Sequence, residues 1–247
     1  MGTPAYCRYM REGTLRIERR GAVAVLHVDD GKVNALTFEL IAAIKEAVQA
    51  ADADDDVGAV VIHGREGKFS AGFDLGVMMA GDIADAIRLV SDGGDLVRTL
   101  YGCGIPVVAA CTGHALAAGA LVLLGCDVRI GADVPAKIGL NEVAIKLVLP
   151  DWAMTIAAAR LSKRHVQRAV VNARITAPAE AVDVGYLDEV VGADVVLETA
   201  VARAAELAAT LDPAAYRITV GRFRGPVLDT MATQIAADRA AGLSVSA

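Results

Sequence analysis

The chain has 247 residues, of which 55% are hydrophobic, and a formal net charge of −6 from 24 basic and 30 acidic residues. This length predicts one α/β domain, or such a domain with a small helical appendage, and the apolar surplus favours buried interfaces between identical subunits. The acidic balance, without any basic run, gives no electrostatic attraction for nucleic acid or for an anionic membrane.

Four cysteines occur, at Cys7, Cys103, Cys111 and Cys126, without a C-x-x-C spacing. This pattern predicts buried thiols in a reducing cytoplasm, with a disulfide or a metal site as the less favoured alternative. Residues 1–12 are polar, and glycine and aspartate interrupt the longest apolar runs, so we expect neither a signal peptide nor a transmembrane segment. The expected location is therefore cytoplasmic.

The first part of the chain alternates between strand and helix patterns. Residues 14–20 and 23–28 alternate apolar and polar side chains on either side of Gly21, which predicts a β-hairpin. Thr37 is a suitable N-cap for a helix whose apolar positions share one face. Those positions are Leu40, Ile41, Ile44 and Val48.

Two runs of small residues then follow predicted strands. Residues 68–75 come after a β-branched run at 59–63, and residues 111–121 come after a second such run at 106–110. Small residues let the backbone approach a ligand closely. Two strand-to-helix turns at neighbouring strand ends would direct free N–H groups at one point, and such a pair predicts an oxyanion hole.

The second half changes from a mixed to a helical pattern. Residues 76–94 contain several glycines and predict a mobile helix or lid, whereas residues 136–152 begin as a strand and place Glu142 among apolar neighbours. After Trp152 we expect only helices, at 153–161, 165–173, 178–184, 195–211 and 226–241. This order predicts an α/β spiral core at 1–191 and a helical subdomain for oligomerisation or lid closure at 192–247.

The two turns together resemble the signature of the crotonase (enoyl-CoA hydratase/isomerase) superfamily, in which a segment of the form F-x-A-G-x-D-[LI] is followed by a G-x-A-x-G-x-G-like turn. The first segment here is Phe69-Ser70-Ala71-Gly72-Phe73-Asp74-Leu75. The resemblance implies the ClpP/crotonase-like fold, a ββα spiral core with a C-terminal helical subdomain. It also implies an acyl-CoA thioester whose carbonyl accepts from the backbone N–H groups of Phe73 and Ala118. Many relatives have glycine at the second position, so Ala118 departs by one methyl group.

The resemblance also directs attention to two acid/base positions. Hydratases of the family hold a water molecule between two glutamates, and the corresponding residues here are Leu121 and Glu142. One carboxylate can move a proton between C2 and C4 of an enoyl thioester, which predicts double-bond isomerisation with Glu142 as general base, its pKa raised by apolar neighbours. The alternatives are an enoyl-CoA hydratase in which another group replaces the missing carboxylate, and a non-catalytic acyl-CoA-binding protein.

The remaining ligand contacts are also implied by the resemblance. Coenzyme A would enter as part of the substrate, with no permanently bound cofactor and no metal. Its groove would be lined by Lys32, Val33, Ala35, Ala71, Asp74, Leu75, Leu121 and Trp152, with Lys32 near the pyrophosphate. A basic residue of a C-terminal helix, Arg222, Arg224 or Arg239, would contribute, and the assembly would be a homotrimer or a dimer of trimers.

Three further polar residues are weaker candidates. Asp151 lies near the position of a nucleophilic aspartate in relatives that hydrolyse aryl-CoA substrates, but the spacing differs, so a turn role after Pro150 is favoured. His114 is expected to pack under the second turn. Ser70 lacks a G-x-S-x-G elbow, which argues against a hydrolase triad.

Overall fold

The computed structural model of the chain describes residues 13–245, with side chains described to residue 241. Its main sheet has six strands in the order β1-β2-β4-β7-β9-β11. The strands are β1 Leu15–Arg20, β2 Val23–Val28, β4 Ala59–Gly64, β7 Val107–Cys111, β9 Val128–Ala132 and β11 Glu189–Val191. Only β1 and β2 pair antiparallel within this sheet, and the other pairs are parallel. The predicted hairpin and α/β core are therefore confirmed.

Two smaller sheets lie beyond the carboxyl ends of the main strands. The first has the order β10-β8-β5, formed by Ile138–Gly139, Gly113–Leu116 and Gly67–Ser70, and the second pairs β3 (Ala35–Leu36) with β6 (Gly72–Phe73). The three-stranded sheet joins parts of both runs of small residues, through β5 and β8, and the two-stranded sheet contains Gly72–Phe73 of the first run. Both runs are thus held by backbone pairing on the same side of the molecule.

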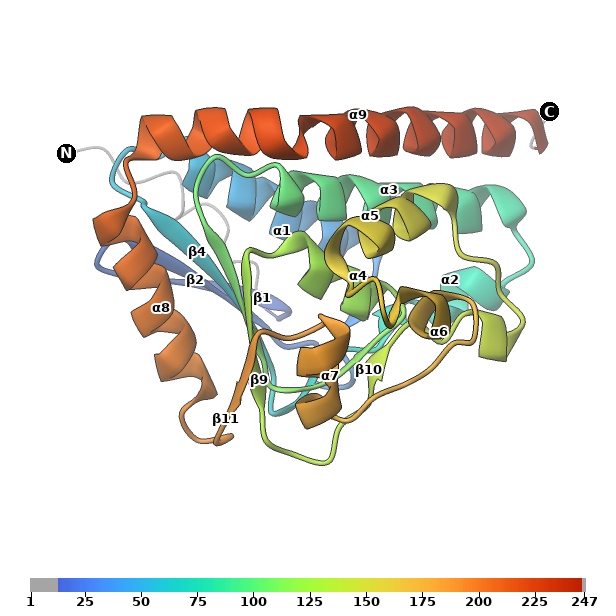
Figure 1. Ribbon diagram of the computed structural model, residues 1–247. Helices are drawn as coiled ribbons and strands as arrows, with labels where there is room; N and C mark the ends of the chain where they lie inside the picture. The colour runs from blue at the N-terminus through green and yellow to red at the C-terminus, as the bar shows by residue number, and fades with distance from the viewer. Residues whose placement is uncertain (1–12, 246–247) are drawn as a thin grey trace.

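Helices cover both faces of the main sheet (Figure 1). Because side chains alternate along a strand, Ala24 and Leu26 of β2 enter the larger core with α1, α3, α4 and α5, whereas Val23 and Val25 face α8. The 33-residue α9 runs along α3 and α5. The helices are α1 Phe38–Asp52, α2 Leu75–Met79, α3 Ile83–Tyr101, α4 Ala118–Gly125, α5 Asp151–Arg160, α6 Val166–Val170, α7 Pro178–Val184, α8 Val196–Thr210 and α9 Pro213–Val245, with a 3-10 turn, η2, at Val143–Ile145.

Several local predictions are confirmed. Thr37 caps α1, since its hydroxyl accepts from the Leu40 amide at 3.2 Å. Three of the cysteines are buried free thiols, Cys103, Cys111 and Cys126, whereas Cys7 lies outside the described residues. Within residues 13–245, none of the helices has the length and apolar character needed to cross a bilayer.

The helical pattern of the second half needs two corrections. The segment after Trp152 is not purely helical, because β11 returns to the main sheet and pairs with β9. The helix expected to begin at Pro226 begins instead at Pro213, so Pro226 lies inside it. Proline inside a helix loses one hydrogen bond. Extensive packing of α9 on α3 and α5 offsets that loss.

Residues 76–94 contain most of α2 and the first part of α3, which agrees with the helical alternative expected there, whereas the mobility of this segment stays a prediction. The Asp82 carboxylate caps α3 by accepting from the amides of Ala84 and Asp85. The two adjacent glycines of α3 have a packing role. A Cβ on Gly93 would lie 2.3 Å from the Phe73 ring, and one on Gly94 would lie 2.9 Å from Ile235 and 3.0 Å from Trp152.

One buried amide joins three segments beside the glycine-rich runs. The Asn34 side chain is fully buried, and its Nδ2 donates to the Val28 carbonyl at 2.9 Å and to the carbonyls of Lys68 and Phe69, each at 3.2 Å. Its Oδ1 accepts from the Asp30 amide at 3.0 Å. Asn34 also adopts a positive φ of 53°, which asparagine tolerates better than most residues.

We therefore expect Asn34→Ala to lower the free energy of unfolding by about 2–4 kcal/mol, because buried partners lose their hydrogen bonds and alanine is strained at positive φ. Urea denaturation of the purified protein measures this change. Asn172→Ala is the matched control, since Asn172 is exposed, and it should change stability by less than about 0.5 kcal/mol. Equal stabilities of the two variants would contradict a structural role for Asn34.

Candidate active site

The two glycine-rich runs contact each other through their backbones. A Cβ on Gly72 would lie 3.0 Å from the Leu116 carbonyl oxygen and 3.3 Å from the Ala118 nitrogen, and one on Gly119 would lie 2.4 Å from the Ser70 carbonyl oxygen. No larger residue fits at Gly119 without a backbone shift. The small residues therefore bring the peptide group before Phe73 close to the N-terminus of α4.

The first turn is held by hydrogen bonds on one side. The Ser70 hydroxyl donates to the Asn34 carbonyl at 2.8 Å and accepts from the Gly72 amide at 3.2 Å. The Asp74 amide donates to the Leu36 carbonyl of β3 at 3.1 Å. Successive amides of an extended chain point to opposite sides, so the Phe73 N–H points away from β3.

The second turn has an unusual backbone. Ala117 adopts φ 51° and ψ −125°, and its amide donates to the Gly139 carbonyl at 3.0 Å. α4 begins at the next residue and has no side-chain cap. The first amides of a helix have no partner within it, and the helix dipole favours negative charge there. The Ala118 N–H is therefore available to an anionic oxygen.

Glu142 is carried to this place by the pairing of β10 with β8. Ile138 and Gly139 align with Ala115 and Leu116, and Glu142 follows at the start of η2. The side chain is 9% exposed, and burial raises the pKa of its carboxyl from 4.5 to about 7. Its Oε2 is buried without a hydrogen-bond partner among the described residues. An unpaired buried carboxyl at such a pKa is suited to exchange protons near neutral pH.

The segment before β3 lies beside the first turn. The Val33 carbonyl accepts from the Ala71 amide at 3.0 Å, and Ala35 belongs to β3, which pairs with β6. Lys32 is exposed, and its carbonyl accepts from the Arg65 guanidinium at 2.7 Å. No local sequence pattern indicates that Arg65 reaches this loop.

The other predicted ligand residues are either buried in the interior or exposed at the surface. Leu121 and Trp152 are both almost completely buried, so each contributes hydrocarbon to the interior. Leu75 is exposed on α2, and its carboxylate neighbour Asp74 caps that helix by accepting from the Gly76 amide at 2.7 Å. Exposed apolar side chains also occur at Met79, Ile83, Val143, Ile145 and Val148.

The C-terminal arginines have different surroundings. Arg224 pairs with Asp127 and stacks on Tyr101, and Arg239 pairs with Asp92 and Asp95 at 2.7 Å. Arg222 is exposed. Of the three, Arg222 is the one without an ion pair among the described residues.

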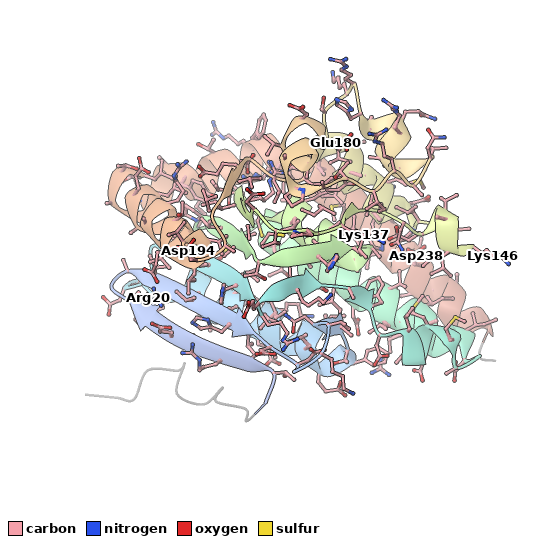
Figure 2. The ribbon with its side chains drawn as sticks, turned by 90° about the horizontal axis from the view of Figure 1, so that it is seen from below. Arg20, Lys137, Lys146, Glu180, Asp194 and Asp238 are labelled. Atoms are coloured by element: carbon pink, nitrogen blue, oxygen red, sulfur yellow. The ribbon has the colours of Figure 1, made fainter. Side chains whose placement is uncertain are left out.

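The weaker candidates have structural roles. The His114 Nδ1 accepts from the Lys137 amide at 3.0 Å, which matches the expected packing under the second turn. Asp151 is exposed at the first turn of α5, and its charge contributes to raising the pKa of Asp238 on α9. Figure 2 shows Asp238 together with Lys146, which ends η2 at the edge of the molecule opposite Arg20.

A cavity of about 400 Å³ lies elsewhere. It is lined in part by His27 and His63, whose Nδ1 atoms are 3.0 Å apart. These two histidines continue the alternate positions of β2 and β4 that face α8, on the other face of the sheet from Leu121 and Trp152. The lining also includes Arg65, which reaches the Lys32 loop, so the cavity adjoins that loop, whereas Glu142 and the two turns are not part of its lining. Among the described residues, no group of three or more His, Cys, Asp or Glu side chains could hold a metal ion.

The two turns touch through Gly72 and the Ala118 nitrogen, and the pairing of β10 with β8 leads the chain to the buried carboxyl group of Glu142. These features are compatible with an α/β enzyme that stabilises negative charge on a carbonyl oxygen while a single base moves a proton.

Comparison with known proteins identifies the family. A family model described as enoyl-CoA hydratase/isomerase matches residues 18–244. The chain is 32% identical over 218 residues to human mitochondrial enoyl-CoA delta isomerase 1, which covers 87% of this chain and 72% of that protein. The chain belongs to the enoyl-CoA hydratase/isomerase family, and the predicted crotonase fold and acyl-CoA enzyme class are confirmed.

Solved structures agree. The crystal structure of human mitochondrial delta3-delta2-enoyl-CoA isomerase superposes with a TM-score of 0.87 at 29% identity, covering 94% of this chain and 91% of that one. An enoyl-CoA hydratase from Mycobacterium marinum gives a TM-score of 0.86 at 36% identity, covering 92% and 99%. Proteins named as isomerase and as hydratase therefore have closely similar backbones.

The contact between the two turns generates a test. Gly119→Ala places a methyl group against the Ser70 carbonyl oxygen, which moves the turns apart, and we expect kcat/KM for an enoyl-CoA to fall by about 100-fold. Steady-state kinetics measures this change. Gly221→Ala is the matched control, because a Cβ there meets open space within α9, and it should leave kinetics unchanged. Wild-type kinetics in Gly119→Ala would show that the close approach is dispensable.

Proposed function

We propose that this protein is an enoyl-CoA isomerase, which moves the double bond of an enoyl-CoA thioester between the C3–C4 and C2–C3 positions. One observation carries the proposal. Glu142 supplies a single buried carboxyl group, whereas Leu121, 1% exposed, supplies only hydrocarbon at the position where a second carboxylate would hold water. One base is sufficient for a proton shift, but not for gripping and activating water.

The proposed reaction needs no other reactant. The thioester oxygen accepts from the N–H groups of Phe73 and Ala118, and ionised Glu142 removes a proton from C2 of the 3-enoyl thioester. The C–H electron pair forms a dienolate whose negative charge is on the thioester oxygen, and each donor stabilises it by about 3 kcal/mol. Protonated Glu142 then delivers the proton to C4, which leaves the double bond between C2 and C3 and restores the carboxylate.

The pKa of Glu142 suits both halves of this cycle. With a pKa of about 7, the carboxyl group is substantially ionised at neutral pH and yet holds the proton well enough to carry it between carbons. The cause is burial among apolar side chains. The same burial excludes bulk water from the dienolate, which protects the proton from exchange.

An enoyl-CoA hydratase is the second candidate, because a protein of Mycobacterium marinum with a similar backbone is named an enoyl-CoA hydratase. It would require a group other than Leu121 to hold the attacking water. A third candidate is an acyl-CoA-binding protein without turnover. Such a protein would retain the two donor turns but would neither isomerise nor hydrate the double bond of the ligand.

The coenzyme A part of the substrate would lie along the Lys32 loop, with Lys32 and Arg65 near its phosphates and backbone around Ala71 and Leu75 near its adenine end. It would enter and leave with each turnover and is not a resident cofactor. Support comes from the neighbouring positions of Lys32 and the first turn. We also propose a trimeric assembly, supported by apolar side chains such as Ile218 and Phe223 that are exposed on α9.

Product analysis distinguishes the three candidates. Incubation of the protein with a 3-enoyl-CoA should yield the 2-enoyl-CoA, and incubation with a 2-enoyl-CoA should yield no 3-hydroxyacyl-CoA. Glu142→Gln should bind the same thioesters and lower isomerisation by at least about 1,000-fold, because an amide cannot accept the proton. Chromatography of both products measures these outcomes.

Glu46→Gln is the matched control for this experiment, since it makes the same chemical change at an exposed position on α1 and should retain full activity. Formation of 3-hydroxyacyl-CoA would favour the hydratase. Binding without either product would favour the non-catalytic protein, and full activity in Glu142→Gln would remove this carboxyl from the mechanism.

The raised pKa of Glu142 also predicts a dependence of stability on pH. Below about pH 4.5 the group is protonated in both states, but between 4.5 and 7 it ionises first in the unfolded chain, so stability is lost as pH rises and the full cost is present above 7. Glu142→Gln should therefore gain about 2–3 kcal/mol relative to wild type between pH 5 and pH 8. Urea denaturation at both values measures this gain, and a constant difference would contradict it.

A further inference from the structure

Three side chains form a row across the first strands of the main sheet. Arg16 of β1 is paired with His27 of β2, and His27 is paired with His63 of β4. Side chains of paired residues lie on the same face of a sheet, so the guanidinium and both imidazoles project together. All three line the cavity of about 400 Å³, a volume that suits a small organic ligand. β1 is an edge strand, and Figure 2 shows its hairpin, with Arg20 at the turn, at the edge of the molecule.

The hydrogen bonds of this row fix the position of each imidazole proton. The Glu18 carboxylate lies 2.8 Å from Nε2 of His27, and Nδ1 of His27 lies 3.0 Å from Nδ1 of His63. Hydrogen bonds from Arg20 and His27 lower the pKa of Glu18 to about 2, so this carboxylate is ionised and can only accept. Neutral His27 therefore donates from Nε2 and accepts at Nδ1, which requires His63 to donate from its own Nδ1.

Both imidazoles are uncharged at neutral pH. Burial lowers the pKa of His27, and burial together with the neighbouring His27, Arg20 and Arg16 lowers the pKa of His63 to about 4. The Glu18 carboxylate opposes both shifts without reversing them. Neutral His63 with its proton on Nδ1 has a lone pair on Nε2. Among the described residues this nitrogen has no hydrogen-bond partner, so the lone pair is available to a ligand.

The charges of the cavity are positive on balance. Arg16 and Arg65 line it, against the single carboxylate of Asp29. Asp29 already pairs with the Arg65 guanidinium at 2.8 Å, whereas the Arg16 side chain is 60% exposed and has only a loose contact with Glu18 at 3.4 Å. A ligand that fits must therefore bring negative charge to the guanidinium groups and a hydrogen-bond donor to Nε2 of His63.

A phosphate monoester meets both requirements. Its anionic oxygens accept from guanidinium groups, and near pH 6 a large fraction carries one P–O–H group that can donate to a neutral imidazole. We propose that this cavity is a second ligand site, which binds a phosphate monoester with its anionic oxygens on Arg16 and Arg65 and its hydroxyl on Nε2 of His63. The site goes beyond the proposed function, because Glu142 and the two turns are not part of its lining.

Calorimetric titration of the full chain with inorganic phosphate and with sulfate at pH 6 tests the site. Sulfate carries the larger negative charge at this pH, but it has no proton to donate to Nε2 of His63. We expect phosphate to bind at least about tenfold more tightly than sulfate. Equal affinities, tighter binding of sulfate, or no binding of phosphate would overturn the proposal.

Arg16→Gln removes one of the two positive charges and should weaken phosphate binding by about tenfold. Arg88→Gln is the matched control, because Arg88 is 61% exposed, has a comparable contact with Asp85 at 3.6 Å, and is not part of the cavity lining. It should bind phosphate as the wild type does. Equal phosphate affinity in the two variants would overturn the proposal.

His63→Leu removes the acceptor and should abolish the preference for phosphate over sulfate. His165→Leu makes the same change at a half-buried histidine outside the cavity lining and should keep the preference. A preference that survives in His63→Leu would overturn the proposal. If His63→Leu does not fold, the comparison of the two ions on the wild type and on Arg16→Gln still decides, since Arg16 is largely exposed.

The phosphate group has two sources, a separate small compound or the coenzyme A part of the substrate, because Arg65 also donates to the Lys32 carbonyl. Repeating the phosphate titration with saturating coenzyme A distinguishes them. Loss of phosphate binding assigns the cavity to coenzyme A, and unchanged binding assigns it to a separate compound. The titrations need no turnover, so Glu142→Gln should bind phosphate as the wild type does, and failure of the proposed isomerase activity is recognised separately.

Discussion

The structure depends on the hydrogen bonds of one buried amide. Asn34 joins the end of β2, the loop before β3 and the end of β5, and its own carbonyl accepts from the Ser70 hydroxyl. Ser70 in turn holds the Gly72 amide. The peptide before Phe73 is therefore fixed by a chain of buried hydrogen bonds and not by packing alone, and the second turn can approach it because glycine replaces any side chain between them.

The carboxyl group beside these turns is a burden on folding. Taking Glu142 out of water without a partner for Oε2 disfavours its charged form, which is the form that a base requires. The protein tolerates this because the group is carried on a short turn that is fixed by the pairing of β10 with β8. The apolar surroundings of the carboxyl group thus have two effects: they lower the stability of the folded state, and they raise the pKa of Glu142 into the range that suits proton transfer.

Features with local signals could be predicted from the sequence, and features that depend on distant contacts could not. Patterns of neighbouring residues predicted the Thr37 cap, the β1–β2 hairpin and the two turns. β11 is three half-buried residues that pair with β9, and Pro226 lies inside a helix that packs on α3 and α5. Glu142 stood out as a carboxylate in an apolar run, whereas Asn34 and Arg65 make contacts across the fold that no local pattern indicates.

The paired glycines of α3 have a consequence for how distant parts of the protein communicate. The Phe73 ring rests on Gly93, while Trp152 and Ile235 rest on the neighbouring Gly94. Among the described residues, α3 thus contacts Phe73 of the first turn and Ile235 of α9 through two adjacent glycines. A ligand, a neighbouring subunit or a truncation that displaces α9 would therefore shift α3, and through α3 it would shift the turn at Phe73 on which the alignment of the thioester depends.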